Sequence, residues 1–140
     1  MIEVKQTRFG NDGNCLQACI ASILDIEDIN TIPDFINEMT DEQIADGTWS
    51  LILQYQLLSM GYCYSICMFD GSEEVAKSLS KLSKQTDGYF IACGINTKET
   101  NTHATVWNAN GFVFSPGTTG SENISEYTYA YCIHTTHDTR

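Results

Sequence analysis

The sequence predicts an α+β fold, in which an N-terminal helix carrying a cysteine packs on a mainly antiparallel sheet of about five strands. Residues 15–24 place apolar side chains at three- and four-residue steps, which is the spacing of a helix with one buried face. Later segments are short and rich in β-branched and aromatic residues, and two of them flank a Gly-containing turn, as in antiparallel hairpins. With 140 residues and 42% hydrophobic content, the chain suits one compact domain over residues 1–134 and a polar tail over residues 135–140.

The remaining elements follow from local patterns. Alternation at the start of residues 2–9 favours a short edge strand, and a short helix is expected after Pro33. A second helix should run from Trp49 to Met60, where Gly61 ends it. An amphipathic crossover helix is expected over residues 73–84 and a polar loop over residues 95–102. Strands are expected at residues 62–69, 88–94, 103–107, 112–114 and 127–133.

Cys15 is the predicted nucleophile. It follows the polar turn Asn11-Asp-Gly-Asn14 and falls in the first turn of the N-terminal helix, where unpaired N–H groups and the helix dipole favour a thiolate. A buried, inert helix cysteine is the alternative, but Cys15 lies off the apolar stripe, which favours exposure. The chain has no signal-peptide pattern, so its thiols should be reduced. Five other cysteines lie in apolar or periodic contexts and are expected to be inert: Cys19, Cys63, Cys67, Cys93 and Cys132.

A cysteine nucleophile needs a base, and His103 is the predicted one. The chain has three histidines, of which His134 and His137 fall in the polar residues near the C-terminus. His103 instead opens the short strand that ends at Trp107, and a Gly turn and a second strand follow. An ordinary surface histidine is the alternative. The pairing of a helix-borne Cys with a strand-borne His favours a site.

These residues and their order resemble small papain-like cysteine peptidases of the bacteriocin-processing type, which are common in bacteriophage and bacterial genomes. The resemblance spans roughly residues 6–120 and is carried by Gly13-Asn-Cys-x-x-Ala-Cys-x-Ala-Ser-x-Leu24, then by His103-Ala-x-Val-Trp107 and a strand ending before Pro116. It implies a papain-like fold. In that family an Asp before the Pro orients the catalytic His, whereas Ser115 stands there in this chain. A Ser hydroxyl can fix an imidazole tautomer but does little to stabilise the imidazolium.

The resemblance also implies roles for individual side chains. Cys15 would attack the carbonyl of an amide or thioester, and His103 would transfer the proton, with Ser115 or Asn108 orienting the imidazole. The Cys15 N–H and Gln6, nine residues upstream, would bind the oxyanion. A plain strand-surface residue is the alternative for Gln6.

Two further side chains are expected to contact substrate. Asn14 precedes the nucleophile, and Trp49 begins a helix near the expected cleft, although a core anchor is the more common role for a Trp. No cofactor or metal is expected. Cys63 and Cys67 are four residues apart, and no companion pair of ligands follows them.

Charge is unevenly distributed along the chain. The net charge is −11, and residues 9–76 contain no Lys or Arg. An acidic half of this kind repels nucleic acid and attracts cationic partners, although solubilising surface is the alternative explanation. The same interval carries twelve acids: Asp12, Asp25, Glu27, Asp28, Asp34, Glu38, Asp41, Glu42, Asp46, Asp70, Glu73 and Glu74.

Two functions from different classes are therefore expected. The first is a cysteine hydrolase or acyltransferase that acts on a peptide, a protein or a small amide. The second is a catalytically impaired scaffold that binds a basic host protein through its acidic half, as a phage-encoded antagonist would. An acidic nucleic-acid mimic is the weaker third reading, because a mimic has no use for a Cys/His pair. No run approaches the ~20 apolar residues of a membrane span, which predicts a cytoplasmic protein with no membrane or nucleic-acid partner.

Overall fold

The sheet has five strands, and every neighbouring pair is antiparallel. The computed structural model describes residues 1–8, 13–35, 37–68, 77, 79, 81–82, 88–96, 102–117 and 124–135. The strand order is β1-β5-β2-β3-β4, so the strand that comes last along the described chain lies inside the sheet, between β1 and β2. The predicted α+β class and the predicted number of strands are confirmed. The strands are β1 (Tyr62–Met68), β2 (Phe90–Asn96), β3 (Thr102–Asn108), β4 (Gly111–Phe114) and β5 (Ile124–Thr135).

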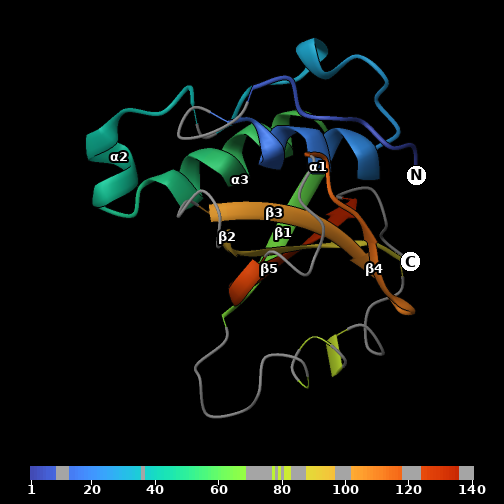
Figure 1. The fold of residues 1–140 in the computed structure, drawn as a ribbon. Coiled ribbons are helices and arrows are strands. Elements are labelled where there is room, and N and C mark those ends of the chain that lie inside the picture. The colour runs from blue at the N-terminus through green and yellow to red at the C-terminus, as the bar shows by residue number, and fades with distance from the viewer. Residues whose placement is uncertain are drawn as a thin grey trace.

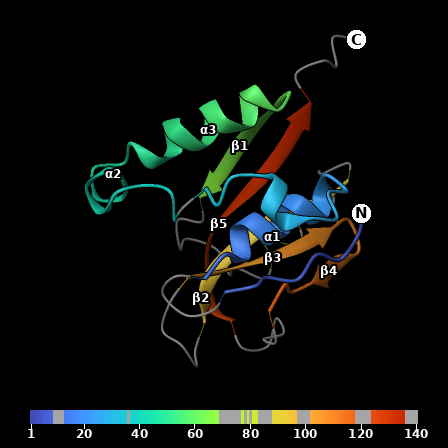
Figure 2. The ribbon, with the colours of Figure 1, turned by 90° about the horizontal axis from the view of Figure 1, so that it is seen from above.

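Two helices cover one face of this sheet (Figures 1 and 2). Helix α1 (Cys15–Ile23) packs mainly on β3, and helix α3 (Trp49–Ser59) packs on β1. Both helices occur where their apolar periodicity predicted them. Shorter elements join them, namely a 3-10 turn η2 (Ile29–Thr31) and helix α2 (Asp41–Ala45).

The core lies between the helices and the sheet. Ile20 of α1 and Leu53 of α3 are buried against the strands, together with Tyr131 of β5. A smaller cluster lies on the opposite face, where Leu79 packs with Phe90 and further residues. Alternate strand residues therefore supply two apolar faces, as the period of a β-strand requires.

The N-terminal segment differs from its prediction. Residues 1–8 form no strand, so the edge strand expected over residues 2–9 is wrong for the part that the structure describes. Its backbone N–H groups form hydrogen bonds outside the sheet. The Val4 N–H donates to Ser22 Oγ at 2.9 Å, and the Gln6 N–H donates to the Pro116 carbonyl at 3.0 Å. The segment thus ties α1 to the residues that follow β4.

The short helix expected after Pro33 begins eight residues beyond that proline. Helix α2 begins at Asp41, because Thr40 and Gln43 form a reciprocal capping box at that point. The capping sequence Thr40-Asp-Glu-Gln43 was a signal for this helix. Asp41 and Glu42 occupy its first turn, where the helix dipole favours acids.

Some expectations fall outside the described residues, including those for the turn at residues 9–12, most of the helix at residues 73–84 and the tail at residues 136–140. Residues 77, 79, 81 and 82 are described and helical. Strand β5 extends further than predicted, so that His134 pairs with Cys63 of β1 and Thr135 pairs with Tyr62. Among the described residues, no helix has the length and apolar character that crossing a membrane requires.

Candidate functional site

Cys15 is the first residue of α1 and is half-buried. The first turn of α1 contains no acidic residue, and the preceding Asn14 makes no side-chain cap to the helix. The positive end of the helix dipole is therefore not offset by a carboxylate of its own first turn, which favours an anionic thiolate at Cys15.

Asn14 fastens the start of α1 to the N-terminal segment. Its side chain is buried, with 2% exposed. Its Oδ1 accepts the N–H groups of Thr7 and Arg8, and its Nδ2 donates to Thr7 Oγ1 and Gln17 Oε1, all at 3.0 Å. These four hydrogen bonds use both donors and both lone pairs of the amide. The structure therefore gives Asn14 a positioning role, because all four hydrogen bonds of its amide go to protein groups.

Gln17 extends this arrangement and was missed from the sequence. Its buried Nε2 donates to the carbonyls of Ile29 and Ile32, at 2.9 and 3.0 Å. Together with the bond from Asn14, these contacts join α1 to the η2 region. A polar residue on a face that is otherwise apolar was the available signal, because a buried amide needs partners.

His103 lies near the beginning of β3, and its side chain is buried with 6% exposed. Its Nε2 is 2.9 Å from Ser115 Oγ, just beyond the end of β4. Ser115 is buried as well. The structure thus brings together the predicted base and Ser115, one of the two residues predicted to orient it.

Gln6 lies beside the imidazole. A Cβ atom added at Gly117 would lie 2.8 Å from Gln6 Oε1 and 3.4 Å from His103 Cε1, so the backbone of Gly117 fills the space next to both side chains. Gln6 Nε2 donates to the Arg8 carbonyl at 2.8 Å, whereas its Oε1 is buried and has no hydrogen-bond partner within the described residues. An amide nitrogen carries two protons, so this bond leaves Nε2 with a second one.

The thiol-bearing helix and the imidazole-bearing strand lie side by side. In Figures 1 and 2, α1 and β3 run in the same direction, so Cys15 and His103 begin their elements at the same end of the molecule. The contacts of Gln6 with Arg8, and of Arg8 with Asn14, join the two ends. A continuous set of contacts therefore connects the surroundings of the imidazole with the start of α1.

Alternation along β3 limits where the side chains of Cys15 and His103 could approach each other. Ala104 and Val106 belong to the core beneath α1. Because neighbouring strand residues face opposite sides of a sheet, the side chain of His103 leaves β3 on the other face. A contact between Cys15 and His103 would therefore form around the beginning of β3 and not across the packed α1–β3 interface.

The remaining predicted residues lie elsewhere. Asn108 ends β3, five residues along the strand from His103, and its Oδ1 accepts the Asn110 N–H at 2.8 Å in the hairpin turn. The structure therefore brings Ser115 to the imidazole and leaves Asn108 at the other end of β3. Trp49 is half-buried and packs edge-on against Tyr131, with ring centroids 6.3 Å apart, as a core anchor does.

A second thiol lies one turn along α1. Cys19 is fully buried, and burial raises the pKa of its thiol well above the usual range, with smaller upward contributions from Cys15 and Cys93. Cys19 is thus held as a neutral, unreactive thiol, in contrast to the half-buried Cys15 at the helix end.

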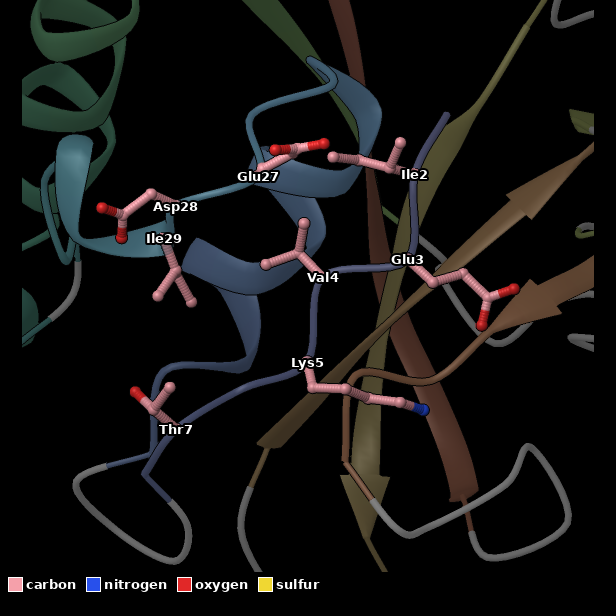
Figure 3. Close-up of a pocket in the computed structure, with 8 residues that line it drawn as sticks. All are labelled: Ile2, Glu3, Val4, Lys5, Thr7, Glu27, Asp28 and Ile29. Atoms are coloured by element: carbon pink, nitrogen blue, oxygen red, sulfur yellow. The ribbon is translucent and has the colours of Figure 1, made fainter.

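A hollow of about 430 Å³ lies between the N-terminal segment and the residues leading into η2 (Figure 3). Val4 and Ile29 contribute apolar groups to it, while the Lys5 side chain points away and its Nζ lies 4.7 Å from the centroid of the Phe114 ring. None of the predicted site residues lines this hollow. Within the part of the chain that the structure describes, no group of three or more His, Cys, Asp or Glu side chains could hold a metal ion.

Comparison with known proteins finds no matching protein family, no matching curated protein and no matching solved structure.

Proposed function

We propose that this chain has a papain-like fold and is a cysteine hydrolase or acyltransferase that acts on an amide or thioester. The observation that carries the proposal is the buried His103 Nε2–Ser115 Oγ contact of 2.9 Å, on the strand against which the Cys15 helix packs. A buried imidazole with one nitrogen fixed by a hydroxyl is an oriented base, and a half-buried thiol at a helix start is a suitable nucleophile.

The proposed reaction begins with transfer of the Cys15 proton to the imidazole. Because Nε2 faces Ser115, the proton passes to the other ring nitrogen, Nδ1. The thiolate attacks the carbonyl carbon, and the Cys15 N–H and Gln6 Nε2 bind the resulting oxyanion. The intermediate collapses as His103 returns the proton to the leaving amine or thiol. Water, or a second amine in a transferase, then attacks the Cys15 thioester and releases the free thiol.

Ser115 limits the power of this base. Nδ1 can accept a proton only when Nε2 carries one and donates it to Ser115 Oγ, but a hydroxyl can equally donate to Nε2 and stabilise the wrong tautomer. Ser115 also offers no negative charge to the imidazolium. We therefore expect a weaker Cys15–His103 ion pair than a carboxylate would support.

The test is the pH dependence of iodoacetamide alkylation, followed residue by residue by mass spectrometry, with half-buried Cys63 as the internal reference thiol. Cys15 should react with an apparent pKa at least about one unit below the free-thiol value of about 8.5, and His103→Ala should abolish the difference. His134→Ala is the matched control and should leave Cys15 unchanged.

Substitutions at Ser115 make the test sharper. Ser115→Asp should lower the apparent pKa of Cys15 further, because a carboxylate stabilises the imidazolium, and Ser115→Ala should raise it. If Cys15 in the wild-type protein reacts no faster than Cys63, and His103→Ala changes nothing, the proposed catalytic pair does not exist.

A further inference from the structure

Helix α3 is apolar on both sides, although only one side is covered. It contains no charged residue. Its inner side buries Leu53 and Leu57 against the sheet. On its outer side Leu51 is 72% exposed, Tyr55 76% and Leu58 50%. A surface helix normally carries charged residues on its solvent side, so α3 has the composition of a helix covered on two faces.

The three exposed apolar residues form one stripe, which we call the α3 outer face: Leu51, Tyr55 and Leu58. They are four and three residues apart, which places them on a single line along the helix. Their exposed area is on the order of a few hundred Å², the range in which an apolar patch on a monomer is commonly a contact site. The face is suited to receiving a second apolar helix at the same spacing.

Acidic residues near this face favour a basic partner. Three residues separate the end of α2 from the start of α3, and Figure 1 shows α2 next to the N-terminal end of α3. Asp41 and Glu42 of α2 and its C-cap residue Asp46 are all exposed. No Lys or Arg occurs between residues 9 and 76 to offset them. An apolar stripe beside acids complements an apolar helix flanked by basic residues.

The same charges disfavour other occupants. A second copy of the chain would bring another net charge of −11 to the contact. An anionic membrane surface would repel the acids of α2 in the same way.

We propose that the α3 outer face, with the acids of α2, is a docking site for a basic amphipathic helix of a partner protein. Leucine-like anchors of the partner would lie against Leu51, Tyr55 and Leu58, and its lysines or arginines would face Asp41, Glu42 and Asp46. The site lies on a different element from Cys15 and His103, and the docking does not depend on the thiol chemistry.

The test uses a synthetic peptide with leucines on one helical face and lysines on the other, and fluorescence anisotropy reports its binding. One control peptide keeps the leucine face but carries glutamates, and a second scrambles the Leu/Lys sequence so that no apolar face forms. The first peptide should bind at least about tenfold more tightly than either control, and salt should weaken it.

Variants locate the binding. Leu51→Ser combined with Tyr55→Ser should weaken binding about tenfold or more, because it removes two anchors. The matched control Phe112→Ser removes a partly exposed aromatic residue from β4 and should change the affinity less than twofold. Cys15→Ala should retain binding, which separates docking from substrate capture. Circular dichroism should show that all variants keep the wild-type fold.

Two results would overturn the docking site. The first is a double variant that binds as tightly as the wild type, because binding would then depend on charge alone. The second is a wild-type dimer in sedimentation velocity that the double variant converts to a monomer, because a second copy would then cover the face.

Discussion

Replacing Asn14 by alanine should destabilise the protein far more than a surface Asn→Ala change. The substitution removes four hydrogen bonds that join the start of α1 to Thr7, Arg8 and Gln17. One of the groups left behind, Gln17 Oε1, is buried. The others lie partly buried in the N-terminal segment, where water can reach them in part.

The magnitude follows from that difference in burial. A buried acceptor left unpaired costs about 1–3 kcal/mol, and each of the three partly buried bonds contributes about 0.5–1.5 kcal/mol. These terms add to about 2.5–7.5 kcal/mol, and because water can reach the partly buried groups, the expected loss in the free energy of unfolding lies in the lower half of that range, about 3–5 kcal/mol. A domain of this size has a total stability of about 5–15 kcal/mol, so the variant should be marginally stable.

Urea denaturation followed by Trp fluorescence measures this loss. At an ordinary slope of about 2 kcal/mol per molar urea, the midpoint should fall by roughly 2 M with an unchanged slope. Exposed Asn30→Ala is the control and should shift stability by less than about 0.5 kcal/mol. A loss below about 1 kcal/mol in Asn14→Ala would refute the view that this amide fastens the helix.

Three other perturbations test separate parts of the structure. Burial raises the pKa of Cys19, so this thiol ionises more easily in the unfolded chain than in the folded one. The free energy of unfolding should therefore fall as the pH rises above about 8.5. Urea denaturation at several pH values should show a smaller fall in Cys19→Ala. Gly117→Ala places a methyl group against Gln6 and should slow any turnover or Cys15 alkylation while leaving the circular dichroism spectrum unchanged. Trp49→Ala should cost about 2–3 kcal/mol by calorimetry through lost packing on Tyr131, and Trp49→Phe should cost less.

The sequence predicted the elements whose patterns are local. The periodicity around Ile20 gave α1, the run ending at Gly61 gave α3, and β-branched and aromatic segments gave the five strands. The N-terminal segment was mispredicted because two alternating residues resemble a strand, whereas its partners, Ser22 and Pro116, are set by tertiary contacts. The start of helix α2 was misplaced, although its capping box is readable in the sequence.

The candidate site was predictable in its residue types but not in its internal contacts. Two alternatives stood for the partner of His103, and only the strand geometry separates them, because Ser115 lies across the hairpin while Asn108 lies at the far end of β3. The sequence could not show that protein groups occupy every hydrogen-bonding position of the Asn14 amide. A polar residue before a nucleophile is compatible with a substrate contact and with a structural role. The exposure of Leu51 and Tyr55 likewise depends on which side of α3 meets the sheet.

The strand order has a consequence for how the protein is made. Strand β5 lies between β1 and β2, although it follows all the other strands along the described chain. Until β5 is synthesised, the sheet cannot be completed. One part, β1 with α3, and the other, β2 with β3 and β4, are then unpaired with each other, and each has an open strand edge. The nascent chain should be most vulnerable to aggregation and to holding by chaperones in that interval. A ribosome stalled before residue 124 would present a polypeptide that contains Cys15, His103 and Ser115 but no completed sheet to hold them.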